Sequence, residues 1–155
     1  MTTEHATTLE RIHQAAKEEF LNKGFQAASL RNIVKSVGTT GAFYGYYKSK
    51  EELFEALAGD AYRFIINRYQ DAHREFAGLP KKRQMEVMGE FSGSCLFDIL
   101  HYAYEHLDEL KLILCCAEGT RFARLIDEMA ETEAESTHAY QRVLEELGRP
   151  SPRID

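Results

Sequence analysis

The chain has 155 residues, of which 44% are hydrophobic and 28% are charged, and it carries a net charge of −6. This composition excludes a disordered or fibrous protein and favours a soluble, helix-rich globular one. No apolar run is long enough to span a membrane, and the start MTTEHATTLE is no signal peptide, so we expect a cytoplasmic protein without a membrane partner.

The charge is distributed unevenly along the chain. Residues 1–50 hold seven Lys or Arg against four Glu, a balance of +3, whereas residues 51–155 hold 12 basic and 21 acidic residues, a balance of −9. Such asymmetry favours a head that faces a polyanion on an acidic body, although a chance imbalance is the alternative.

The first expected helix covers residues 8–23. Thr7 and Glu10 have the spacing of a capping box, and apolar residues then recur at helical intervals. Gly24 lies where a left-handed residue ends a helix, so we expect Phe25 to fold back onto the last turn.

Two short helices are expected next. Ser29 is a good N-cap for a helix over residues 30–36, and Gly38 would end it. A very short third helix would begin at Thr39 or Thr40 and run to about Tyr46. Two short helices joined by a tight turn, after a longer supporting helix, fit helix-turn-helix geometry.

Four further helices are expected in the rest of the chain, at about residues 50–76, 80–103, 107–117 and 120–148. The second of them is apolar on more than one face, so we expect it to be central. The prediction is therefore an all-α fold. It has a three-helix helix-turn-helix head in residues 1–50 and a helical ligand-sensing and dimerisation domain in residues 51–155.

The segment 39–50, TTGAFYGYYKSK, meets the requirements of a helix that reads DNA. Small or polar residues must face base edges, and neighbouring groups must hold phosphates. Thr39 and Thr40 offer hydroxyl groups, Gly41 allows close approach, and Phe43 is expected to point inward as an anchor. The residues suited to phosphate contacts are Tyr44, Tyr46, Lys48 and Lys50.

The stretch from Arg11 to Leu57 resembles the DNA-binding domain of the TetR family of transcriptional regulators. The family pattern has an apolar second helix, a Gly turn, a recognition helix ending in Tyr, and then an aromatic, basic and acidic segment. Its positions are filled here by Ile33, Gly38, Tyr44, Tyr47, Lys48, Lys50, Glu51, Glu52 and Leu53. The remainder resembles the family only in being helical.

The resemblance implies an assignment of roles to individual residues. Those that it places against a double-stranded DNA operator are Thr39, Thr40, Gly41 and Tyr44. It further implies that Arg31 and Lys50 grip backbone phosphates, and that Tyr47 packs where the family usually has Phe.

Two departures from the family pattern affect this interpretation. One residue is missing between Gly38 and the recognition helix, which would rotate that helix by about 100° if the helix itself took up the loss. A changed turn could absorb the loss, or the deletion could weaken DNA binding. Family members are also usually longer, so we expect the regulatory domain to be incomplete or the dimer to use another surface.

A ligand cavity is expected between the helices of the regulatory domain, with an apolar wall and a few polar anchors. The residues predicted to line it are Phe91, Cys95, His101 and Phe122, and a place in the hydrophobic core is the alternative for each. His101 and Glu105 share a helix face, but no third ligand joins them, so we predict neither a metal site nor a cofactor.

The favoured function is a homodimeric DNA-binding regulator, a repressor released from its operator by a small-molecule effector. The alternative is a helical protein-interaction module that has lost sequence-specific DNA binding. No motif assembles a nucleophile, a base and an orienting acid, so we do not expect an enzyme. An enzyme that uses His101 or Cys95 remains a third hypothesis.

Overall fold

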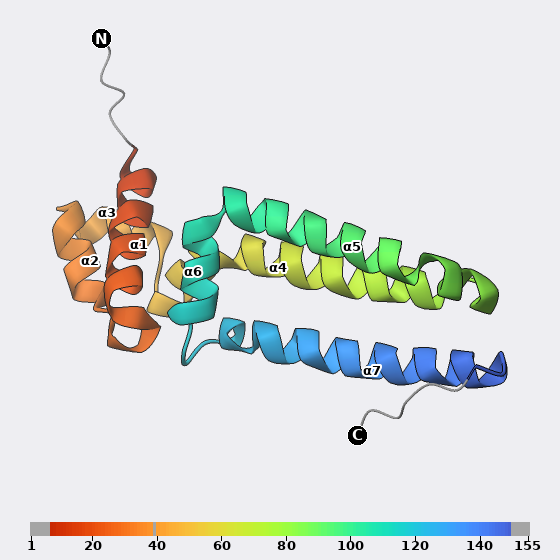
Figure 1. Ribbon diagram of the computed structural model, residues 1–155. Helices are drawn as coiled ribbons and strands as arrows, with labels where there is room; N and C mark the ends of the chain where they lie inside the picture. Colours follow the sequence, from red (N-terminus) through yellow and green to blue (C-terminus); the bar gives the residue numbers. More distant parts are fainter. Residues whose placement is uncertain (1–6, 39, 150–155) are drawn as a thin grey trace, which may run out of the picture. The chain divides into compact units, whose positions relative to one another are not determined.

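The computed structural model describes residues 7–38 and 40–149, and within these ranges it contains helices and no strand, which confirms the all-α prediction (Figure 1). The elements are α1 (Thr8–Ala27), α2 (Leu30–Val37), α3 (Thr40–Tyr46), α4 (Lys50–Ala77), α5 (Lys81–Glu105), α6 (Leu107–Cys115), the 3₁₀ turn η1 (Arg121–Arg124) and α7 (Leu125–Glu146). No helix in the described ranges has the length and apolar character needed to cross a lipid bilayer.

These helices form two compact units, each built from two separate stretches of the chain. The first unit combines the described residues up to Tyr62 with His106–Ala123, and so contains α1, α2, α3, the start of α4, and α6. The second combines Arg63–Glu105 with the described residues from Arg124 onward. The predicted boundary at residue 50 coincides with the N-terminus of α4, whereas the units divide further along that helix.

The predicted signals at both ends of α1 are present. Glu10 N donates to Thr7 Oγ1 at 3.2 Å, and Thr7 N donates to Glu10 Oε2 at 2.7 Å, which completes the capping box. Gly24 has a φ of +75°, and a last helical turn follows this kink to Ala27 instead of the predicted end at residue 23. The Phe25 ring folds back to within 6.0 Å of the Phe20 ring, as expected.

Aromatic side chains fill the core of the first unit. The Phe54 ring meets the Phe20 ring edge-on at 5.1 Å and lies 5.8 Å from the Phe122 ring, and all three side chains are buried. Helix α6 belongs to this core because Phe25 N donates a hydrogen bond of 2.8 Å to the carbonyl of Cys116. The helix-turn-helix segment is therefore supported by residues from far along the chain.

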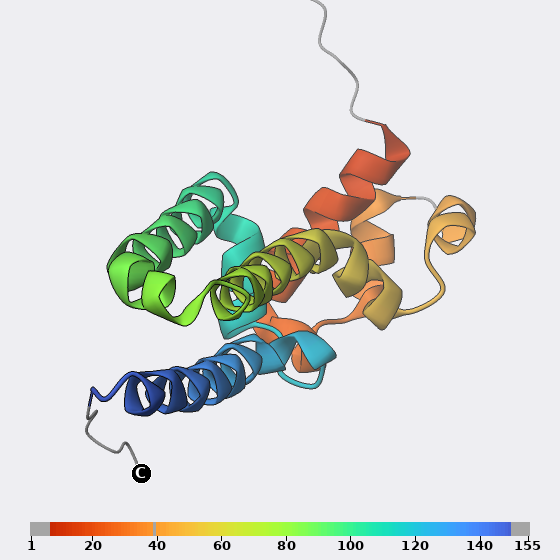
Figure 2. The same cartoon turned by 90° about the vertical axis from the view of Figure 1, so that its right-hand side faces the viewer.

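The second unit consists of the rest of α4 together with α5 and α7 (Figures 1 and 2). The expectation that α5 is central is wrong. Its buried residues are Gln84, Cys95 and Ile99. Its apolar residues extend around more of the helix than α4 and α7 cover, and those left between 57% and 79% exposed are Leu96, Phe97, Leu100 and Tyr104.

Candidate nucleic-acid interface and ligand cavity

The connection from α2 to α3 follows the predicted helix-turn-helix pattern. Ser29 caps α2, because its Oγ accepts a hydrogen bond of 3.3 Å from Asn32 N. Gly38 ends α2 in the left-handed conformation, with a φ of +80°. Of the predicted DNA-facing residues, Thr39 lies outside the described residues, as does the side chain of Thr40, where α3 begins.

The side chain of Phe43 anchors α3 to the first unit, as predicted, since none of its surface is exposed. Gly41 and Ala42, in the first turn of the helix, are exposed. Tyr44 and Tyr46 are 50% and 51% exposed. Phe43 is thus buried, and the predicted contact residues of α3 that the structure describes are exposed around the rest of the helix.

Tyr47 packs at the end of α3, as the family resemblance implies. Its ring lies 6.4 Å from the Phe43 ring, and its hydroxyl group shares a hydrogen bond with His13 Nε2 on α1. Burial lowers the pKa of His13, with a smaller effect from the charge of Lys17, and burial raises the pKa of Tyr47. The contact ties the C-terminal end of α3 to α1.

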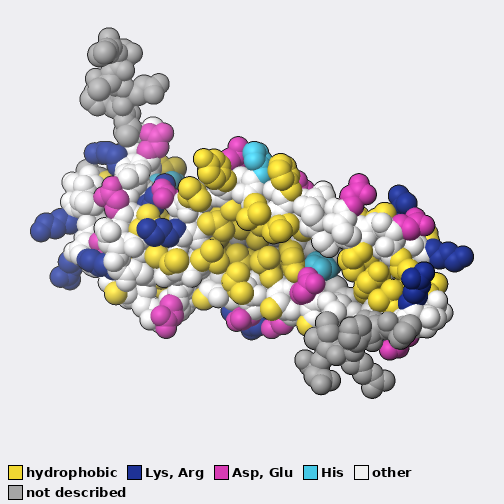
Figure 3. All heavy atoms as spheres, viewed as in Figure 1, with side chains coloured by type: hydrophobic (Ala, Val, Ile, Leu, Met, Phe, Trp, Pro, Cys, Tyr) yellow, Lys and Arg dark blue, Asp and Glu magenta, His cyan; other side chains and the backbone are white. Residues whose placement is uncertain are grey.

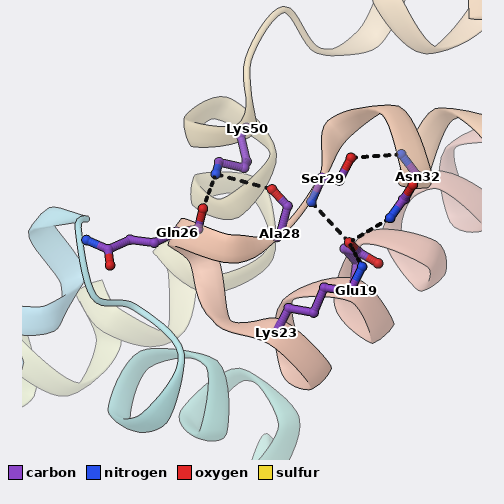
Figure 4. Close-up of polar contacts among 7 residues, drawn as sticks. All are labelled: Glu19, Lys23, Gln26, Ala28, Ser29, Asn32 and Lys50. Carbon is purple, nitrogen blue, oxygen red and sulfur yellow. Dashed lines mark hydrogen bonds and ion pairs between the residues drawn. The ribbon is translucent and has the colours of Figure 1, made fainter.

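The ammonium group of Lys50 is held by backbone carbonyls of the first unit. Its Nζ donates to the carbonyl oxygen of Gln26 at 3.1 Å and to that of Ala28 at 3.3 Å (Figure 4). It also lies 4.7 Å from the centre of the Phe25 ring. Lys50 therefore fastens the start of α4 to the link between α1 and α2, a role that the sequence did not predict.

Glu19 joins α2 to α1 through one carboxylate oxygen. Its Oε1 accepts from Lys23 Nζ at 2.8 Å, from Ser29 N at 3.0 Å and from Asn32 Nδ2 at 3.5 Å (Figure 4). The bond from Lys23, and next the one from Ser29 N, lowers the pKa of Glu19. No local pattern signals this role, because two of the donors lie at least ten residues further along the chain.

Basic side chains of the first unit face solvent. Arg31 on α2 is exposed, and so is Lys48, whose backbone N donates to Glu52 Oε2 at 2.8 Å. In Figure 3 several Lys and Arg side chains gather over α1, α2 and α3. Of the predicted phosphate contacts, Arg31, Tyr44, Tyr46 and Lys48 are thus exposed, and Lys50 is half-buried.

The second unit contains a cavity of about 240 Å³ between α4, α5 and α7. Its wall includes Phe91 and Cys95, two of the residues predicted for this purpose. The wall is mainly apolar and rich in aromatic and sulfur-containing side chains, which also include Phe76, Met88, Met129 and Tyr140. Such a wall suits a small organic ligand.

A polar cluster of three side chains lies on the cavity wall. Tyr69 Oη donates to Glu133 Oε2 at 2.6 Å, and His73 Nε2 lies 3.3 Å from the same oxygen. Burial raises the pKa of Tyr69, and the bond to Glu133 adds to this effect. The cluster links α4 to α7 and sets a carboxylate in the apolar wall.

The other two predicted ligand-binding residues do not line this cavity. His101 is exposed, with its Nε2 3.7 Å from Glu105 Oε1, and Phe122 is buried in the core of the first unit. Neither residue is therefore part of the wall of this cavity. Within the described residues, no three His, Cys, Asp or Glu side chains come together in a group able to hold a metal ion.

Sequence reasoning missed the polar cluster Tyr69, His73 and Glu133. A signal was present, because Tyr69 and His73 share one face of α4 with Phe76, at intervals of four and three residues. On α7, Glu133 lies one turn after Met129 on the same face. A polar residue on an otherwise apolar helix face indicates the wall of a ligand cavity.

Comparisons with known proteins agree with the helix-turn-helix assignment. Residues 12–57 match the family described as "Bacterial regulatory proteins, tetR family". The chain is 48% identical over 50 residues to the uncharacterized HTH-type transcriptional regulator YvdT of Bacillus subtilis, which covers 32% of the chain and 26% of that protein. It is 32% identical over 66 residues to the HTH-type transcriptional repressor KstR2 of Mycolicibacterium smegmatis, over 42% of the chain and 32% of that protein.

A longer alignment relates the chain to the probable HTH-type transcriptional regulator YttP of Bacillus subtilis, with 27% identity over 142 residues, 90% of the chain and 64% of that protein. The chain thus spans less than two thirds of the length of each of these relatives. No solved structure matches it. The names of these three relatives describe them as transcriptional regulators.

Proposed function

We propose that the chain, whose residues 12–57 match the TetR family of transcriptional regulators, is a homodimeric repressor that leaves its operator when a small-molecule effector binds in the second unit. In this proposal α3 enters the major groove of double-stranded DNA. A dimer would place two copies of α3 in successive major grooves, about 34 Å apart, on a near-palindromic site.

The observation that carries the proposal is the contrast in α3 between a buried anchor and exposed contact residues. Phe43 holds the helix in the core, while Gly41, Tyr44 and Tyr46 remain exposed. A rigidly held helix with exposed small and hydroxyl-bearing residues suits base and phosphate contacts. Arg31 and Lys48 would supply further phosphate contacts from the neighbouring surface.

Two features of the second unit support the regulatory part of the proposal. The cavity of about 240 Å³ offers a place for the effector, and α4 contributes residues to both units. A ligand that displaces α4 would alter the support of α3, and a coupling free energy of about 1–3 kcal/mol would suffice to switch occupancy. The exposed apolar residues of α5, such as Phe97 and Leu100, favour association with a second copy.

A selection from a pool of random DNA duplexes tests the proposal. We expect enrichment of near-palindromic sequences and an affinity that falls steeply as salt is added, because phosphate contacts release counterions. If the pool yields no preferred sequence, the protein-interaction module is the better explanation, and the exposed apolar surface of α5 would be its docking face.

A pair of glycine substitutions sharpens this test. Apart from its chain neighbours and the local helix backbone, a methyl group added at Gly41 or at Gly89 meets no described atom within 4 Å. Both Gly41→Ala and Gly89→Ala should therefore stabilise their helices, by about 0.5–1 kcal/mol. Because only Gly41 would approach DNA, we expect Gly41→Ala to weaken binding to the selected duplex by roughly tenfold. Equal DNA affinities for the two variants would remove α3 from the interface.

A further inference from the structure

The side chains that line the cavity include few charged groups. Among the described residues that line the cavity there is one carboxylate, that of Glu133, and neither Lys nor Arg. An anionic ligand would therefore enter an apolar space next to a negative charge, with no Lys or Arg among the described wall residues to compensate it. The wall favours a ligand that brings a positive charge or a hydrogen-bond donor.

The position of Glu133 indicates how such a ligand would lie. Its side chain is 58% exposed and therefore stands at the mouth of the cavity, where an ammonium group could keep part of its hydration. Within the described residues, the two contacts of its carboxylate, from Tyr69 and His73, both reach Oε2. These contacts hold the carboxylate in place and leave Oε1 as the oxygen for the ligand.

The inner wall suits the apolar part of the ligand. Phe76 and Phe91, with ring centres 5.8 Å apart, and Tyr140, 5.6 Å from Phe76, provide aromatic surfaces, while Met88 and Met129 provide adaptable thioethers. The volume of about 240 Å³ is below the range of about 300–1,000 Å³ that is typical of drug-sized ligands. The occupant should be a compact molecule with a hydrocarbon or aromatic body.

We propose that this cavity binds an apolar amine, whose ammonium group bonds to Glu133 while its hydrocarbon body lies against the aromatic and methionine side chains. The inference rests on the proposed function, in which the second unit is the sensor, and it names the chemical class of the effector. Charge complementarity at the mouth and apolar contact within are both required for tight binding.

Three probes of nearly equal size test the charge preference by isothermal titration calorimetry on the full chain at pH 7. They are 4-phenylbutylamine, which is cationic, 4-phenylbutan-1-ol, which is neutral, and 4-phenylbutyrate, which is anionic. We expect the amine to bind roughly tenfold more tightly than the alcohol, and the carboxylate to bind most weakly. Equal affinities, or tighter binding of the carboxylate, would overturn the proposal.

A matched pair of variants locates the charge. Glu133→Gln keeps the shape of the side chain and an oxygen acceptor for Tyr69, and it should weaken amine binding by roughly tenfold while leaving alcohol binding unchanged. Glu131→Gln is the control, because Glu131 is on the same helix but pairs with Arg124, outside the cavity wall. If both variants lose the same affinity, the amine binds to the acidic surface in general and the proposal fails.

Two further outcomes separate this inference from the proposed function. If the chain selects a DNA sequence but shows no preference for the amine, the inference fails alone. If the amine is preferred through Glu133 but no duplex is selected, the amine site is supported and the proposed repressor function is contradicted.

Amine binding that disappears as protein concentration rises would show that a second copy fills the cavity, and it would overturn the proposal.

Discussion

The two units differ in how they use their apolar residues. In the first unit the rings of Phe20, Phe54 and Phe122 contact one another in a filled core, and the surface around α3 is polar or basic. The second unit leaves a cavity of about 240 Å³ among its helices. The first unit thus has a filled core, and the second unit keeps a cavity among its helices.

This difference matches two kinds of recognition. A DNA groove is read by a helix whose position must be defined closely, and a filled core with specific clamps, such as Lys50 and Glu19, provides that rigidity. A small ligand requires unfilled volume, which costs stability because the lining atoms lose contacts. The same chain therefore combines a well-packed region with a loosely packed one.

The largest expected effect comes from removing an aromatic ring from each region. Phe54→Ala should lower the free energy of unfolding by about 3–5 kcal/mol, because the ring is fully buried and its neighbours are other rings. Phe91→Ala, in the wall of the existing cavity, should cost only about 1–2 kcal/mol. Urea denaturation measures both values, and equal losses would mean that the two regions do not differ in packing.

An intermediate effect is expected at Lys50, where two roles compete. If its bonds to Gln26 and Ala28 are its main role, Lys50→Met should lower the free energy of unfolding by about 1–2 kcal/mol. If it serves only as a phosphate contact, stability should be unchanged, and the slope of DNA affinity against salt should fall by about one.

Lys48→Met is the matched comparison for Lys50→Met, because the Lys48 side chain is exposed in the segment next to the start of α4. We expect it to reduce the salt slope without changing stability. Thermal melting followed by circular dichroism, together with gel shifts at several salt concentrations, measures both quantities for each variant. Equal stability of the two variants would contradict the clamp that we assign to Lys50.

The smallest expected effect is that of His13 on the pH dependence of the stability of the first unit. Because burial lowers the pKa of His13 from its ordinary value of 6.5, the unfolded chain binds a proton more readily than the folded chain. The stability of the first unit should therefore decrease as pH falls below about 6.5. In the variant His13→Gln this part of the pH dependence should be absent from unfolding curves measured at pH 5 to 8, and an unchanged slope would contradict the assignment.

The features that were predictable from sequence depend on neighbouring residues. The cap at Thr7, the N-cap at Ser29 and the helix end at Gly38 each require only three or four residues around them, and all three are confirmed. The inward position of Phe43, expected for an anchor of this short helix, is also confirmed.

The features that were missed depend on pairs of distant segments. The ammonium group of Lys50 reaches carbonyls more than twenty residues earlier, and Glu133 meets Tyr69 across 64 positions of the chain. His101 and Phe122 were assigned to the ligand cavity on residue type alone, but which face of a helix is covered depends on its partners. Local sequence cannot supply that information.

The hydrogen bond from Phe25 to the carbonyl of Cys116 has a consequence for biosynthesis. The first unit needs residues up to Ala123 before its core is complete, so it cannot finish folding as soon as its helix-turn-helix segment leaves the ribosome. Until then Phe54 lacks the ring of Phe122. A nascent chain halted near residue 60 should therefore be open to proteases, and it should become resistant only after the segment that begins at His106 has emerged.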